Sequence, residues 1–118
     1  MYAVLCIDDH NTTLSELSFL VRSCGFICLT APTAEEAVSA FEQSRVNMVV
    51  LDHDLSSSSA VALAKSLKQV RDVPIILLSG KTMEEKPHNV DLVIPKPIEA
   101  RVFSKMLQWV ARGSRSVA

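Results

Sequence analysis

The sequence has few of the residues that cross-link a small protein or hold a structural metal. Its three cysteines are Cys6, Cys24 and Cys28; no Cys-x-x-Cys pair occurs, and the three histidines are scattered. A disulfide framework and a clustered zinc site are therefore not expected, and the thiols are predicted to be reduced and buried. The N-terminal segment reaches Asp8 without a basic residue, so we expect no signal peptide.

Long apolar runs and an excess of one charge are also missing. No run approaches the roughly 20 apolar residues of a membrane span, which predicts a cytoplasmic protein without membrane contact. The 12 Lys+Arg and 13 Asp+Glu residues sum to −1, which gives no reason to expect nucleic-acid binding. That sum hides a split, since residues 1–60 carry a net charge of −6 and residues 61–118 a net charge of +5.

What the sequence does contain is enough apolar material for one globular domain. It has 118 residues, of which 48% are hydrophobic and 21% charged. A chain of this size can bury a core without disulfides or a metal. We assign residues 1–112 to the domain and residues 113–118 to a flexible C-terminal tail.

Five short apolar runs, rich in Val, Ile and Leu, are typical of strands buried on both faces of a parallel sheet. They are Ala3–Ile7, Phe26–Leu29, Met48–Leu51, Ile75–Leu78 and Leu92–Ile94.

Helical patterns lie between the runs. Asn11 is predicted to cap the first helix, Thr33 to open the second with a capping box, and the serines before Ala60 to start the third. The last helix is expected near residues 99–111. The connection has only nine residues, from Lys81 to Asn89, and includes Pro87, so we expect a stunted fourth helix or an irregular loop there. This alternation predicts a doubly wound α/β fold.

Polar side chains follow four of the five predicted strands. Because the carboxyl ends of parallel strands meet at one edge, several carboxylates should converge there with a hydroxyl and an ammonium. Clustered carboxylates repel one another unless a cation lies among them, and oxygen ligands favour Mg²⁺. Together these groups are the parts needed for phosphoryl transfer to a carboxylate. They are Asp8, Asp9, Asp52, Asp54, Ser79 and Lys96.

In these motifs the sequence resembles a response-regulator receiver domain, the CheY-like phosphoacceptor of two-component signalling. The resemblance rests on Asp8-Asp9, Asp52 after a Val-Val-Leu run, Ser79-Gly80 and Lys96-Pro97, and it spans essentially the whole chain. It implies a flavodoxin-like (βα)5 fold with strand order 2-1-3-4-5. It also implies a switch that assists its own phosphorylation and dephosphorylation rather than a metabolic enzyme.

The resemblance further implies a role for each site residue. Asp52 resembles the residue that accepts a phosphoryl group from a histidine kinase or phosphotransfer protein. Asp9 resembles the direct Mg²⁺ ligand and Asp8 the acid that holds metal-bound waters, with the Asp54 backbone carbonyl completing the metal shell. Ser79 resembles the switch hydroxyl. Lys96 resembles the lysine that pairs with the phosphoryl group, in a peptide bond to proline that can be cis.

Several features depart from the family pattern. The position of the usual aromatic switch residue holds Val93, so the familiar coupling of hydroxyl movement to aromatic rotation cannot operate unchanged. The shortened fourth helix makes family-style dimerisation doubtful, and a monomer or weak dimer is expected. We also hypothesise that Asp54 and Lys81 pair across the entrance to the site and modulate phosphoryl lifetime. His10 and His53 are expected at the rim of the site rather than as ligands.

Two alternatives remain open. One is a pseudo-receiver, an interaction module that never carries phosphate, which Val93 and the stunted helix favour. The other is a haloacid-dehalogenase-like phosphatase, since Asp52-His53-Asp54 resembles the Asp-x-Asp of that family. In the receiver interpretation, output passes through an unknown partner protein or a missing output domain. A basic face on or after the last helix, formed by Arg101, Lys105, Arg112 and Arg115, is a candidate surface for an acidic partner.

Overall fold

A five-stranded parallel sheet forms the centre of the molecule in the computed structural model, which describes residues 1–55, 58–82 and 85–113. The strand order is β2-β1-β3-β4-β5, which confirms the expected doubly wound α/β fold. The strands are β1 (Ala3–Ile7), β2 (Ile27–Ala31), β3 (Met48–Asp52), β4 (Ile75–Ser79) and β5 (Leu92–Pro95).

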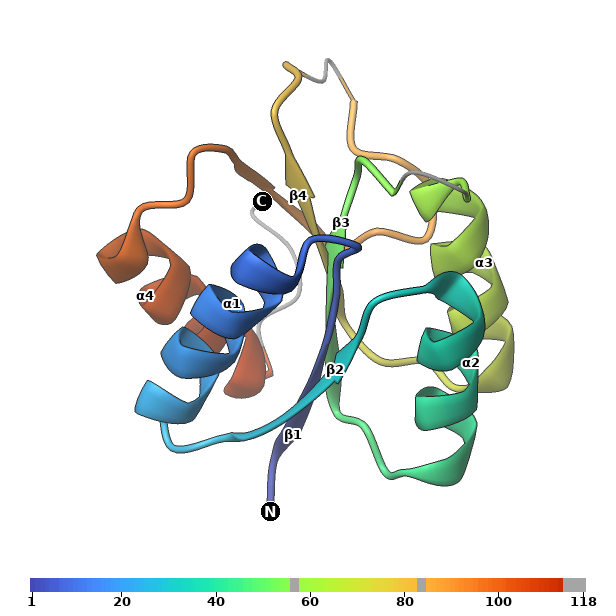
Figure 1. Ribbon diagram of the computed structural model, residues 1–118, viewed down its shortest axis with the longest axis horizontal. Helices are drawn as coiled ribbons and strands as arrows, with labels where there is room; N and C mark the ends of the chain where they lie inside the picture. Colours follow the sequence, from blue (N-terminus) through green and yellow to red (C-terminus); the bar gives the residue numbers. More distant parts are fainter. Residues whose placement is uncertain (56–57, 83–84, 114–118) are drawn as a thin grey trace.

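Helices cover both faces of the sheet. Figure 1 shows α1 (Asn11–Ser23) and α4 (Ala100–Ala111) on one face, and α2 (Ala34–Gln43) and α3 (Ala60–Val70) on the other. Each face has its own apolar core: one core includes Leu51 and Phe41, and the other includes Val50 and Phe103. Consecutive residues of a strand point to opposite faces, and helices cover both faces of this sheet. The strands β1, β3 and β4 are therefore buried throughout, and their sequences are apolar up to the terminal Asp52 of β3 and Ser79 of β4.

The edge strand β2 differs from its predicted state. It begins at Ile27, one residue later than expected, and runs on to Ala31. Burial on both faces was also wrong for this strand, since Ile27 is 40% exposed and only Ala31 is buried. The physical reason is its position, because β2 pairs with β1 alone and lies at the edge of the sheet.

Helix ends follow local capping chemistry, with one exception. The hydroxyls of Thr33 and Ser59 accept hydrogen bonds from the backbone N–H groups of Glu36 and Ala62, as predicted for α2 and α3. Asn11, however, is the first residue of α1 and not its cap. The cap is His10, whose side chain makes no capping hydrogen bond.

The connection between β4 and β5 contains no helix in its described residues, 80–82 and 85–91. The described part of this connection is thus an irregular loop, one of the two outcomes predicted for it. Asn89 has a left-handed backbone, with φ of 69°, in the turn that leads into β5. The Lys96–Pro97 peptide bond that follows β5 is cis, as expected.

The cysteines are free thiols in three environments. Cys6 is buried in β1, but Cys24 and Cys28 are only half-buried, so the prediction of three buried thiols was wrong for two of them. Cys24 lies at the end of α1 and Cys28 lies on the edge strand β2, where side chains are less completely covered.

Among the described residues, no helix is both long enough and apolar enough to cross a membrane.

Candidate functional site

The register of the sheet brings the polar strand ends together. Ile7 pairs with Leu51, so the residues that follow them, Asp8 and Asp52, lie side by side on neighbouring strands. Ser79 pairs with Pro95 across the β4–β5 ladder, which places Lys96 beyond the same edge. The site therefore lies at the carboxyl ends of the strands, around the point where the strand order reverses.

Asp8, Asp9 and Asp52 form one acidic cluster, together with His10. One donor atom from each of the four residues lies within 4.8 Å of all the others. Asp8 and Asp52 are each only 1% exposed. The structure thus brings together the three carboxylates that the strand-end argument predicted to converge.

His10 takes a larger part in this cluster than a rim residue would. Its ring is 70% exposed, yet its Nδ1 atom lies 3.1 Å from Asp8 Oδ1 and 3.0 Å from Asp9 Oδ1. Its backbone N–H also donates to Asp8 Oδ1 over 2.9 Å, which holds the turn between β1 and α1. The available signal in the sequence was its position directly after Asp8-Asp9, since a residue there shares their edge of the sheet.

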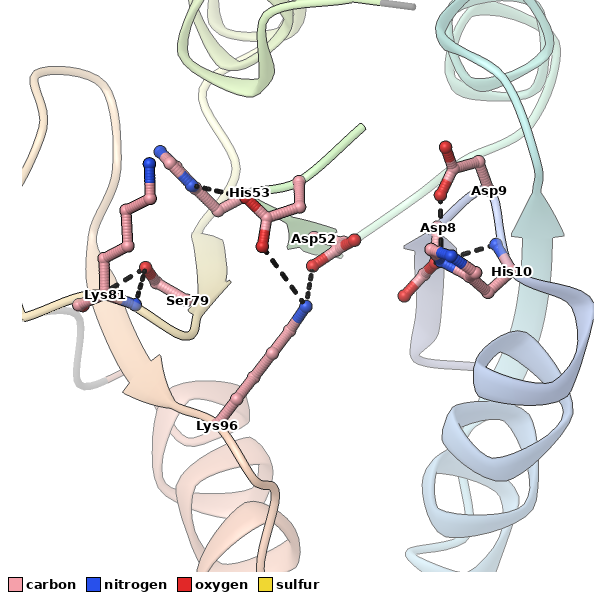
Figure 2. Close-up of polar contacts among 9 residues, drawn as sticks. Asp8, Asp9, His10, Asp52, His53, Ser79, Lys81 and Lys96 are labelled. Carbon is pink, nitrogen blue, oxygen red and sulfur yellow. Dashed lines mark hydrogen bonds and ion pairs between the residues drawn. The ribbon is translucent and has the colours of Figure 1, made fainter. Parts of the chain in front are cut away.

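Asp52 lies between a cation and the rest of the acidic cluster. Figure 2 shows Lys96 on one side of its carboxylate and Asp8, Asp9 and His10 on the other. Lys96 Nζ forms an ion pair with Asp52 Oδ1. The second oxygen, Oδ2, is buried and has no hydrogen-bond partner among the described residues. A buried carboxylate oxygen without a partner is costly, which points to a ligand for it.

Asp54 contacts different residues from those expected. Its Oδ2 atom lies 4.0 Å from Lys96 Nζ, and its Oδ1 atom lies 3.3 Å from His53 Nδ1. Among the ion pairs of the described residues, none joins Asp54 to Lys81, so the hypothesised pair is not formed here. Asp54 instead competes with Asp52 for the same ammonium, from a side chain that is 55% exposed.

Ser79 is buried and turned toward the loop that follows it. Its hydroxyl accepts a hydrogen bond from the Lys81 N–H over 3.1 Å and contacts the Lys81 carbonyl at 3.3 Å (Figure 2). Beside it lies an open cavity of about 580 Å³ whose lining includes Lys81, Lys86 and Lys96. The hydroxyl therefore stands at the edge of the site, bonded to the backbone of its own loop.

The carboxylate donors of the cluster fit a hard divalent cation. Mg²⁺ takes oxygen ligands, is bound through one or two carboxylates and retains waters. Three carboxylates and the Lys96 ammonium leave two negative charges, which one such cation neutralises. The observation that favours a ligand at this point is that the buried Asp52 Oδ2 atom has no hydrogen-bond partner among the described residues.

The sequence matches the response regulator receiver domain family over residues 4–108. This chain belongs to that family. It is a receiver domain of two-component signalling, a class of signalling switches rather than classical enzymes, whose members bind Mg²⁺ at an acidic pocket. These findings favour the receiver domain over the haloacid-dehalogenase-like phosphatase.

Individual relatives agree with this assignment. The sensory transduction protein RegX3 of Mycolicibacterium smegmatis is 28% identical over 117 residues, covering 95% of this chain and 51% of RegX3. The chain spans about half the length of the curated relatives that it matches. The chemotaxis protein CheY4 of Vibrio cholerae shares the fold, with a TM-score of 0.85 at 23% identity over 93% of this chain and 98% of CheY4.

A two-component response regulator from Clostridium difficile gives a TM-score of 0.88 at 19% identity, over 96% of this chain and 98% of that one. The absence of a helix from the described part of the β4–β5 connection therefore leaves the receiver fold intact.

Proposed function

We propose that this receiver accepts a phosphoryl group on Asp52, with Mg²⁺ held by Asp8, Asp9, Asp52 and the backbone carbonyl of Asp54. The observation that supports Asp52 is its carboxylate, which is buried, paired with Lys96 through one oxygen and without a hydrogen-bond partner at the other among the described residues. The ion pair orients the carboxylate, and an oxygen of this carboxylate attacks phosphorus.

The transfer step exchanges one bond at phosphorus for another. The Asp52 carboxylate attacks the phosphorus of a phosphohistidine or a small phosphodonor, the N–P or O–P bond of the donor breaks, and the leaving group keeps the electron pair. The product is an aspartyl phosphate. Hydrolysis reverses the state of Asp52, because water attacks the phosphorus, the aspartyl O–P bond breaks, and inorganic phosphate leaves.

Charge neutralisation is the main catalytic task in such a transfer, because the phosphoryl oxygens carry most of the negative charge. Lys96 provides one fixed positive charge at the carboxylate. When bound, Mg²⁺ supplies the remaining positive charge at the same oxygens. Asp54 lies within 4.0 Å of the lysine and would hold its ammonium near the entrance when Asp52 is modified.

Ser79 is proposed as the switch hydroxyl. In the structure its hydroxyl is bonded to the backbone of Lys81, so reaching a phosphoryl group requires those contacts to break. The movement would be transmitted through the β4–β5 connection rather than through an aromatic side chain, because the switch position holds the half-buried Val93.

The donor is proposed to be a sensor histidine kinase or a phosphotransfer protein in the cytoplasm. Output would pass through a partner protein or a further domain, and the domain would act as a monomer or weak dimer spanning residues 1–112. The exposed Arg101, Lys105 and Arg112 of the last helix remain a candidate contact surface, while Arg115 lies outside the described residues.

Labelling with a small phosphodonor tests the proposal. Acetyl phosphate and Mg²⁺ should add the mass of one phosphoryl group, and beryllofluoride should shift the amide signals of residues around Asp52 and Ser79. Asp52→Asn should abolish both effects. Asp54→Asn is the matched control and should still be labelled, since the neighbouring carboxylate is more exposed and is not the acceptor. An unmodified wild type would favour the pseudo-receiver interpretation instead.

A further inference from the structure

His10 places an imidazole nitrogen in an otherwise all-oxygen cation site. The ring belongs to the residue that caps α1, where a polar side chain ordinarily accepts a hydrogen bond from the first turn of the helix. His10 makes no such bond. Its ring is turned to Asp8 and Asp9 instead, at 3.1 and 3.0 Å from their Oδ1 atoms.

These distances suit donors of one cation. Metal–ligand bonds of about 2.1 Å at right angles place neighbouring donor atoms about 3 Å apart. Hydrogen bonding alone accounts for them less fully, because Nδ1 carries at most one hydrogen and can donate fully to only one of the two carboxylates. A cation can bind all three donor atoms at once.

The backbone positions the Cα of His10 independently of its ring. The His10 N–H donates to Asp8 Oδ1 over 2.9 Å, and the His10 carbonyl accepts the first helical hydrogen bond, from Leu14, over 3.0 Å. The Cα of His10 is therefore anchored beside the carboxylates, within reach of both for its ring.

A second observation points to a ligand at the same place. Asp52 is 99% buried, its Oδ1 atom pairs with Lys96, and its Oδ2 atom has no hydrogen-bond partner in the part of the chain that the structure describes. A donor atom of Asp52 also lies within 4.8 Å of those of Asp8, Asp9 and His10. A cation in this cluster would thus bind both the buried carboxylate and the imidazole.

We infer that His10 binds a cation through Nδ1. The site then prefers a borderline transition-metal dication, such as Zn²⁺ or Co²⁺, over Mg²⁺, and this preference is larger than the carboxylates alone would give. Imidazole suits Zn²⁺, Co²⁺ and related ions, whereas Mg²⁺ favours oxygen. The inference rests on the proposed function and deepens it, since it concerns the same cation site.

Metal titration of the unphosphorylated protein tests the inference without any phosphodonor. Zn²⁺ and Mg²⁺ affinities are measured by calorimetry for the wild type, His10→Ala and His10→Gln, and Co²⁺ binding is followed by its visible absorption. Both substitutions should weaken Zn²⁺ and Co²⁺ binding at least about tenfold and leave Mg²⁺ binding within about twofold. The Co²⁺ spectrum should also lose its nitrogen-ligand contribution.

His53→Ala and His88→Ala are the matched controls, because neither imidazole belongs to the four-residue cluster. They should retain the wild-type preference. The inference is overturned if His10→Ala leaves Zn²⁺ and Co²⁺ affinity unchanged, if it weakens Mg²⁺ equally, or if His53→Ala has the same effect. Failure of the proposed phosphorylation would appear separately, as an unlabelled Asp52 in a protein whose metal preference still depends on His10.

Discussion

Two thiols on neighbouring strands illustrate how burial and contact act on single residues. Cys6 of β1 and Cys28 of β2 have their Sγ atoms 3.8 Å apart. The contact with Cys28 and burial raise the pKa of Cys6 well above its usual value. The same contact, assisted by Ser18 and Arg22, lowers the pKa of Cys28 to about 7 against the opposing effect of its partial burial. The two thiols should therefore differ strongly in reactivity.

Alkylation rates should reveal this difference. Thiolate is the reactive form, so modification of Cys28 by iodoacetamide should rise with pH through a midpoint near 7 rather than near 9. The buried Cys6 should remain unmodified in the native protein. Peptide mass mapping across a pH series measures both rates. In Cys6→Ala the Cys28 midpoint should move upward, because the side-chain hydrogen bond from residue 6 is lost. A wild-type midpoint near 9 would contradict the assigned contact.

For single residues, the sequence predicts which side chains lie in the site better than it predicts their individual contacts. Asp8, Asp9 and Asp52 could be assigned to one cluster because parallel strands end at one edge. The contacts of Asp54 and Ser79 could not, since both depend on loop conformations that no periodicity describes. Asp54 lies beside His53 and Lys96, and Ser79 bonds to its own loop.

Helix α2 shows how much a single element depends on its cap. The hydroxyl of Thr33 accepts a hydrogen bond from the Glu36 N–H over 3.1 Å, and the helix then buries Ala37 and Phe41 in the core. Without the cap, one amide of the first turn has only water as a partner.

Thr33→Ala should lower the free energy of unfolding by about 1 kcal/mol, the usual cost of losing such a cap. Urea denaturation followed by circular dichroism measures it. Thr12→Ala is a suitable control, because Thr12 is an exposed helical residue with no side-chain hydrogen bond recorded in the described structure. Its substitution should be neutral or slightly stabilising, given the helix propensity of alanine. Equal losses in both variants would contradict the capping role.

Strands and helices were largely predictable because each pattern is local. All five strands were located within two residues at each end, and the caps of α2 and α3 follow from their serine and threonine. The exposure of β2 was not predictable from its own apolar run, because the order of the strands decides whether a strand lies at the edge or in the centre of the sheet. The cap of α1 was misplaced by one residue, since His10 is not a usual capping residue.

For the whole molecule, the acidic cluster lowers the stability of the free protein and provides a binding site for a cation. Asp8, Asp9 and Asp52 hold like charges together, and Lys96 and His10 are basic groups that contact them. Neutralising one carboxylate should relieve repulsion in the free protein and weaken its cation site.

Asp9→Asn should therefore unfold at the same or a higher temperature than the wild type in EDTA. Saturating Mg²⁺ should stabilise the wild type, by about 2.7 kcal/mol at 100 times its Kd, and stabilise the variant much less. Thermal unfolding of both proteins in EDTA and in saturating Mg²⁺ measures these differences. Glu16→Gln, at an exposed position of α1, should keep the wild-type response. A variant destabilised equally in both buffers would mean that Asp9 is structural.

The hydrogen bonds of Ser79 to its own loop bear on how completely phosphorylation could switch this domain. Releasing those contacts costs about 1 to 2 kcal/mol, and a charge-assisted bond from the hydroxyl to a phosphoryl oxygen returns about 1.5 to 3 kcal/mol. The net gain of about 1 kcal/mol changes a conformational equilibrium roughly fivefold. A fivefold change cannot by itself convert one nearly fully populated conformation into another, so a partner that binds one conformation would set much of the response.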